Sequence, residues 1–228
     1  MGRPCLAYLA ACSVVCLTAC GHATAARIHE VPPGRSIVVF GDSLALGTGA
    51  SDASRGFAFV LYGRILARTP SALITSYAIG GARVADLIDE ELPQAAGHVA
   101  TDVWVCVGAN DVTHGTPPKR FRQDLQKLLR SIRRHWPQAR LVIFGIPDVS
   151  RSPLFAGSGR ADLSREAGVD NTAMHAVAAE YGGTFIDLFT FSRAAMDARR
   201  DLASDNFHPN DRGHRAIAEY AAGALRLP

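Results

Sequence analysis

Five short apolar runs alternate along the chain with segments whose apolar residues recur at helical spacing. The apolar runs predict strands at 37–40, 73–79, 102–107, 141–144 and 184–188. The segments between and after them predict helices at 57–67, around 84–88, and at 121–132, 174–181 and 215–225. This alternation favours a parallel sheet with helices on both faces, since right-handed crossovers return the chain to the same sheet edge. The predicted fold class is therefore α/β: a three-layer α/β/α sandwich around a central five-stranded parallel sheet.

A single domain is expected for most of the chain. The 228 residues are 48% hydrophobic, which is enough for one substantial core, and no internal repeat is present. Residues 37–228 are predicted to form this domain, preceded by a linker at 26–36 that contains Pro and Gly.

The first 25 residues have the composition of an export signal. Arg3 is their only charged residue, and residues 6–17 are nearly all apolar, which is too short for a membrane span of about 20 residues. Two processing sites are visible. Leu17-Thr18-Ala19-Cys20 resembles the bacterial lipoprotein motif, with Cys20 as the lipidated residue, whereas Ala23-Thr24-Ala25 fits ordinary signal cleavage. We expect an exported bacterial protein, secreted or held in the cell envelope through Cys20.

Charge and cysteine content exclude several classes of protein. The net charge is +3 with no long basic run, so the sequence does not support a nucleic-acid partner. Cys106 is the only cysteine after the signal, which leaves no disulfide within the domain. It lies in the apolar run 103–107 and is expected to be buried and unreactive.

Three predicted strands run into turns that carry glycine and polar residues. The first ends at Gly41-Asp42-Ser43, the second at Gly80-Gly81 and the third at Gly108-Ala109-Asn110-Asp111. In a parallel sheet these turns share one edge, where open α/β sheets bind their ligands. Ser43 is therefore a candidate nucleophile, and Asn110 and the backbone at Gly81 or Gly80 are candidates for a neighbouring role.

A base for this serine stands near the C-terminus, in Asp205-Asn206-Phe207-His208-Pro209. An Asp three residues before a His can reach imidazole Nδ1, which leaves Nε2 for the serine. Serine needs such a base to act as a nucleophile. The oxyanion needs preorganised donors, for which the N–H groups of Ser43 and Gly81 and the Asn110 amide are candidates.

Together these residues resemble the GDSL/SGNH hydrolase family over nearly all of the chain after the signal. Ser43, Gly81, Asn110 and His208 match the family's four marker residues in order, and Asp205 completes its D-x-x-H block. Gly81 rather than Gly80 aligns with the family's glycine. The resemblance implies a flavodoxin-like fold and ester or thioester hydrolysis through an acyl-serine intermediate, with no metal or cofactor.

Several other polar residues near these motifs are assigned no catalytic role. Asp42 and Asp111 are interpreted as hydrogen-bonding loop residues and His214 as structural. Arg83 either contacts a polar or anionic group of the substrate or is a surface residue. The remaining histidines of the domain are interpreted as loop or surface residues without metal-binding spacing: His98, His114, His135 and His175.

A long irregular stretch at 147–164 is predicted to lie over the same sheet edge as Ser43. Leu154 and Phe155 within it either line an acyl pocket or make a small separate contact. Whether the stretch is a lid is left open.

The sequence thus predicts an exported serine esterase or lipase acting on short- to medium-chain acyl esters. The alternative is a carbohydrate O-acetyl esterase or acyltransferase acting on cell-envelope glycans. A non-catalytic envelope binding protein is a third hypothesis, which the intact set of marker residues disfavours. A monomer is the default expectation.

Overall fold

The computed structural model describes residues 34–157 and 159–227. The predicted signal at 1–25, Cys20 and most of the linker at 26–36 lie outside this range. The strands are β1 Ser36–Gly41, β2 Leu73–Ser76, β3 Asp102–Cys106, β4 Arg140–Phe144 and β5 Thr184–Ile186. The α-helices are α1 Ser43–Leu46, α2 Phe57–Leu66, α3 Val84–Asp86, α4 Leu92–Gln94, α5 Ala109–Thr113, α6 Pro118–His135, α7 Arg160–Glu180, α8 Leu188–Ala195, α9 Ala198–Asp201 and α10 Asp211–Ala224.

The five strands form one parallel sheet in the order β2-β1-β3-β4-β5. Four strand ends are in register, since Gly41 pairs with Cys106, Cys106 with Phe144, and Phe144 with Ile186. The loops after these strands therefore leave the sheet along one line. This confirms the predicted three-layer α/β/α sandwich and brings the motif-bearing turns to a common edge.

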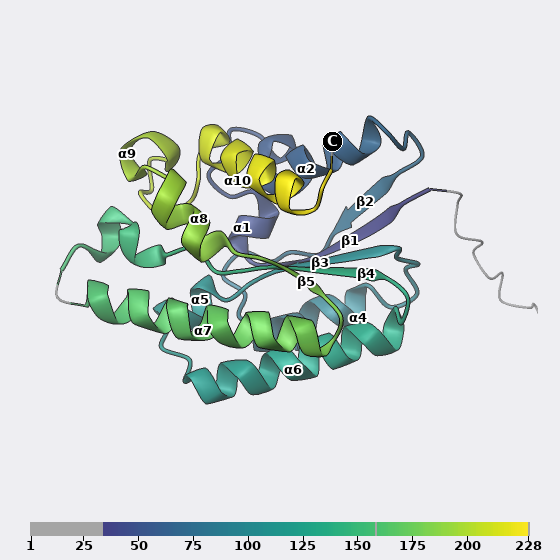
Figure 1. The fold of residues 1–228 in the computed structure, drawn as a ribbon, viewed down its shortest axis with the longest axis horizontal. Helices are drawn as coiled ribbons and strands as arrows, with labels where there is room; N and C mark the ends of the chain where they lie inside the picture. Colours follow the sequence, from purple (N-terminus) through teal and green to yellow (C-terminus); the bar gives the residue numbers. More distant parts are fainter. Residues whose placement is uncertain (1–33, 158, 228) are drawn as a thin grey trace, which may run out of the picture. The chain divides into compact units, whose positions relative to one another are not determined.

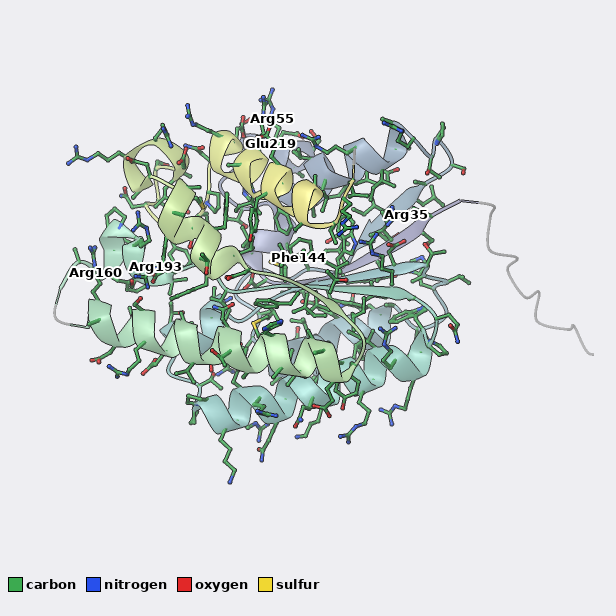
Figure 2. The ribbon with its side chains drawn as sticks, viewed as in Figure 1. Arg35, Arg55, Phe144, Arg160, Arg193 and Glu219 are labelled. Carbon is green, nitrogen blue, oxygen red and sulfur yellow. The ribbon has the colours of Figure 1, made fainter. Side chains whose placement is uncertain are left out.

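Alternating residues of β1, β3 and β4 supply two hydrophobic cores. Val38 and Phe40 of β1 face the side covered by α6 and α7, whereas Ile37 and Val39 face the side covered by α2 and α10. Figure 1 shows α6 and α7 on one face of the sheet and α2, α8 and α10 on the other. Phe144, labelled near the centre of Figure 2, is fully buried, whereas the labelled Arg55 and Glu219 are exposed. The continuous apolar runs that identified the strands are thus explained by burial on both faces of the sheet.

Two predicted elements differ in extent near β1. The second strand ends at Ser76 instead of residue 79, because the backbone N–H of Gly41 in β1 donates its hydrogen bond to the side chain of Glu91 and not to the backbone of the second strand. The helix around 84–88 continues to Gln94 through a π-helical turn at Leu87–Glu91. Pro93 lies inside this helix, which ends one residue later at Gln94.

The region after β4 is more helical than predicted. The irregular stretch at 147–164 contains 3-10 turns at Val149–Arg151 and Pro153–Phe155, and α7 begins at Arg160. α7 thus extends the predicted helix at 174–181 toward its N-terminus. The added turns lack an apolar stripe and are held by polar contacts, such as Asn171 bonded to both backbone groups of Ile146. The short helices α8 and α9 were not predicted.

No helix in residues 34–157 and 159–227 is long and apolar enough to cross a membrane.

Candidate active site

Ser43 stands at the tight turn between β1 and α1. Gly41 has φ +155°, and a Cβ there would lie 2.1 Å from the carbonyl oxygen of Cys106, so glycine is required. Asp42 caps α1 by accepting a hydrogen bond of 2.9 Å from the N–H of Leu44. Ser43 is the first residue of α1, and N–H groups in a first helical turn have no acceptor within the helix. The turn therefore places both the hydroxyl and a backbone donor of Ser43 at the carboxyl edge of the sheet.

The loop before α10 brings a histidine to this serine. His208 Nε2 lies 2.9 Å from Ser43 Oγ, and His208 Nδ1 lies 2.6 Å from Asp205 Oδ2. Since an ionised carboxylate only accepts hydrogen bonds, Nδ1 carries the proton and Nε2 accepts from the serine hydroxyl. The arrangement is that of a nucleophile, its general base and the group that orients the base.

Asp205 is held in its ionised form by the same loop. Its Oδ1 accepts the backbone N–H groups of Phe207 at 2.9 Å and His208 at 3.0 Å. Partial burial works to raise the pKa of Asp205, but the bonds from the His208 side chain and these two N–H groups outweigh it and lower the pKa. Asn210 anchors the loop by donating to the carbonyls of Arg200 and Leu202.

The segments that carry Gly81 and Asn110 follow the two strands that flank β1. Gly81 comes after β2 with φ +85°, a conformation that favours glycine. Asn110 lies in the first turn of α5 after β3, and its Nδ2 donates to the carbonyl of Ala82 at 3.0 Å. The amide of Asn110 is thus tied to the residue next to Gly81. The structure brings the two segments together at the edge that carries Ser43.

An apolar pocket opens beside Ser43 and His208. It holds about 80 Å³ of free space, and its apolar walls come from five separate segments of the chain. These walls include Leu44, Val149, Met196, Leu202, Phe207 and Ile217.

The segment after β4 contributes to this pocket, but Leu154 and Phe155 do not line it. Leu154 is 60% exposed, and Phe155 packs edge-on against Phe207 with ring centroids 5.9 Å apart. Of the two alternatives for these residues, the small separate contact is the correct one. Ser152 Oγ donates to the carbonyl of Asn206 at 2.6 Å, which ties this segment to the His208 loop.

The family model described as "GDSL-like Lipase/Acylhydrolase family" matches residues 39–216, which include Ser43, Gly81, Asn110, Asp205 and His208. The chain belongs to the GDSL-like lipase/acylhydrolase family. It is accordingly a serine hydrolase that acts on carboxylic ester bonds. No match was found among curated proteins.

Solved structures with this fold include proteins described as esterases. A member of the lipolytic G-D-S-L family from Veillonella parvula is 21% identical with a TM-score of 0.68, covering 85% of this chain and 99% of its own. The psychrotrophic esterase EstA from Pseudoalteromonas sp. is 16% identical with a TM-score of 0.66, covering 84% and 97%. Axe2, an acetylxylan esterase from Geobacillus stearothermophilus, is 17% identical with a TM-score of 0.66, covering 86% and 95%. At these identities the likeness establishes the shared fold.

Two buried carboxyl groups, those of Asp42 and Asp111, lie next to Ser43 and Asn110 in this GDSL-family chain. Burial raises the pKa of Asp42 to about 7, and the nearby charge of Asp111 adds to the rise. Burial also raises the pKa of Asp111, whose carboxylate accepts the N–H of Val84 at 3.0 Å. Both residues hold local backbone, as their interpretation from sequence proposed.

Three of the remaining histidines make hydrogen bonds to backbone groups. His214 is fully buried, where its Nδ1 accepts the N–H of Phe57 and its Nε2 donates to the carbonyl of Thr48. Burial lowers the pKa of His214. His114 Nδ1 bonds to the carbonyl of Asn110, and His135 Nδ1 to that of Ser131. Over the described ranges, no three His, Cys, Asp or Glu residues are grouped to hold a metal ion.

Sequence reasoning missed two sets of residues at this site. Met196 and Leu202 line the pocket from a region in which no element was predicted, and their sequence context lacks a periodic signal. Glu91 was missed because it stands in the acidic run Asp89-Glu90-Glu91, which is typical of a solvated helix face. The nearest sequence feature that could have indicated an irregular helical turn at Glu91 was Pro93, two positions later.

Proposed function

We propose that this family member is an exported serine esterase that hydrolyses short- to medium-chain acyl esters, with Ser43, His208 and Asp205 as its catalytic triad. The observation that carries this proposal is the continuous hydrogen-bonded path from Ser43 Oγ through His208 to Asp205, with distances of 2.9 and 2.6 Å.

In the acylation step, Ser43 Oγ attacks the ester carbonyl while His208 Nε2 takes the hydroxyl proton. The carbonyl oxygen becomes an oxyanion, which accepts hydrogen bonds from the N–H groups of Ser43 and Gly81 and from Asn110 Nδ2. When the tetrahedral intermediate collapses, the C–O bond to the alcohol breaks and His208 returns the proton to the leaving alkoxide. The products are free alcohol and an acyl-serine.

In the deacylation step, a water molecule takes the place of the alcohol. His208 Nε2 removes a proton from the water as it attacks the acyl carbonyl, and the same donors hold the second oxyanion. Collapse breaks the bond to Ser43 Oγ, which regains its proton from His208. Asp205 keeps the proton of Nδ1 in place and stabilises the imidazolium in both steps.

The size of the apolar pocket supports the proposed acyl length. A water-sized group needs roughly 10–15 Å³ of such space, so about 80 Å³ accommodates roughly five to eight of them. This suits an acyl chain of a few carbons and does not suit a long lipid chain that is fully enclosed. The wall of Val149, Met196 and Leu202 provides an apolar surface for its methylene groups.

The decisive experiment is hydrolysis of p-nitrophenyl esters from acetyl to palmitoyl by wild type and Ser43→Ala. We expect wild-type activity that is highest between acetyl and octanoyl and that disappears in the variant. Activity that persists in folded Ser43→Ala would refute the serine mechanism. A maximum at palmitoyl would refute the proposed acyl length.

A carbohydrate O-acetyl esterase is the second candidate, because a hollow of about 360 Å³ adjoins the segments that carry Asn110 and Gly81. Its lining includes the exposed side chains of Arg83, His114 and Arg120, which are able to bind sugar hydroxyls. Release of acetate from acetylated xylan is the test. Under this candidate Arg83→Gln raises the KM for the polysaccharide and leaves p-nitrophenyl acetate hydrolysis unchanged.

Export and lipidation complete the proposal, with Cys20 as the candidate lipid anchor and cleavage after Ala25 as its alternative. Mass spectrometry of the N-terminal peptide from the native host distinguishes them. A lipidated Cys20 and loss of membrane attachment in Cys20→Ala support the anchor, whereas an N-terminus at Ala26 supports free secretion. An N-terminus at Met1 would contradict export.

A further inference from the structure

Glu91 has an ionisable side chain that takes no part in the catalytic mechanism proposed above, yet the residue is fully buried. It ends the π-helical turn Leu87–Glu91, in which the N–H of Leu92 bonds to the carbonyl of Leu87. Proline has no N–H and its ring crowds the carbonyl four residues earlier, so Pro93 favours this widened turn. The turn directs Glu91 toward the sheet while its neighbours Asp89 and Glu90 lie on the exposed side.

The carboxyl group of Glu91 accepts hydrogen bonds from two backbone N–H groups, one at the end of β1 and one in the segment after β2. Its Oε2 accepts the N–H of Gly41 at 2.8 Å, and its Oε1 accepts the N–H of Ile79 at 3.3 Å. The N–H of Ile79 also donates to the carbonyl of Gly41 at 2.9 Å, as in a continued parallel ladder. The next ladder acceptor for Gly41 would be the carbonyl of Tyr77. Glu91 occupies that position, so the regular ladder ends at Ser76 although the N–H groups of Tyr77 and Ile79 still donate to the β1 carbonyls of Val39 and Gly41.

Both anchored residues lie two positions before a residue of the proposed site. Gly41 precedes Ser43, and Ile79 precedes Gly81. We propose that Glu91 is a positioning residue that sets the separation between the turn that carries the Ser43 nucleophile and the turn that carries the oxyanion donor Gly81, by binding the backbone of both segments through one carboxyl group. This proposal rests on the catalytic roles proposed above for Ser43 and Gly81.

A carboxyl group meets the demand for an acceptor at both backbone N–H groups. A carboxyl group presents two oxygens to two N–H donors, whereas a glutamine would direct its NH₂ group at one of them. Burial raises the pKa of Glu91 to about 8, with the charges of Asp42 and Glu90 adding to the rise and the two N–H bonds opposing it. A group that is this costly to ionise and has no cation at its carboxyl in the described contacts is consistent with a geometric role.

The test compares Glu91→Gln and Glu91→Asp with the matched control Glu90→Gln in the full chain, using p-nitrophenyl butyrate as substrate. Positional errors of about 1 Å cost roughly 10²-fold in rate. We expect kcat to fall by roughly 10²-fold in Glu91→Gln with little change in KM, and by less in Glu91→Asp, which keeps both oxygens. The control is expected to match wild type. Inactivation of Ser43 by a phosphonate ester is expected to slow in parallel with kcat.

Two results would overturn the proposal: a kcat in folded Glu91→Gln within threefold of the control, or a change confined to KM. If neither variant folds, amide NMR of the wild-type chain decides. Gly41 and Ile79 must then show amide proton shifts that titrate together with the Glu91 carboxyl, and independent titration refutes the shared contact. Failure of the serine mechanism is separate, since it requires Ser43→Ala to remain active.

Discussion

His208 Nδ1 lies 2.6 Å from Oδ2 of Asp205, a residue only three positions earlier in the same loop. The orienting carboxylate is therefore delivered by local chain geometry, whereas Ser43, which the histidine serves, lies 165 positions away in the sequence. The contact between His208 and Asp205 depends on a short loop, whereas the contact between His208 and Ser43 depends on the packing of the whole domain.

Asp205→Asn tests the contact between His208 and Asp205. The amide presents an N–H₂ group to the imidazole and favours the tautomer with the proton on Nε2, where it cannot accept from Ser43. Asp205 is 44% exposed, so water replaces part of its effect. We expect kcat/KM to fall by roughly 10²-fold, a value within the range for general-base catalysis. The exposed Asp162→Asn is the control, and equal activity of the two variants would contradict the role of Asp205.

Asn110→Ala tests the oxyanion donor. Loss of one such donor costs roughly 10²–10³-fold in kcat, with KM little changed because the bond strengthens only in the transition state. Thr113→Ala, on the same short helix, controls for disturbance of α5. Steady-state kinetics on p-nitrophenyl acetate measures both variants. A kcat for Asn110→Ala within a few-fold of Thr113→Ala would remove Asn110 from the oxyanion hole.

Met196→Trp tests the acyl pocket. The larger side chain reduces the space beside Ser43, so longer acyl chains lose contacts that the acetyl group never makes. One methylene in such a pocket changes selectivity by roughly 10-fold or more. We expect the kcat/KM ratio of octanoyl to acetyl ester to fall by at least about 10-fold, with Met196→Leu near wild type. An unchanged ratio would place the acyl chain elsewhere.

The buried carboxyl groups predict how stability depends on pH. The pKa of Glu91 is about 8 in the folded chain and near 4.5 when unfolded, so the folded state binds more protons between these values. Stability from this group is full below the lower value and is lost as pH rises through about 8. Urea unfolding should therefore show stability falling between pH 6.5 and 8, less steeply in Glu91→Gln. Equal slopes would contradict the raised pKa of Glu91.

Much of the fold was predictable because its signals are local. Apolar runs such as 102–107 are strands buried on both faces, and the glycine turns at Gly41 and Gly108 end them. α7 was predicted only in its C-terminal part, since its first turns depend on polar contacts such as those of Asn171 with Ile146. Such contacts join distant segments and leave no period in the sequence.

The sequence by itself determined the strand–helix alternation, the polar turns at the strand ends and the Asp205–His208 spacing, because each depends on residues close together in the chain. Only the tertiary structure decided that His208 reaches Ser43, that Met196 and Leu202 complete a pocket, and that Glu91 is buried between two strand ends. The physical reason is that these outcomes depend on how helices pack on the two faces of the sheet. An acidic residue is solvated on the outer side of a helix, whereas on the side that faces the sheet it binds backbone N–H groups, as Glu91 does.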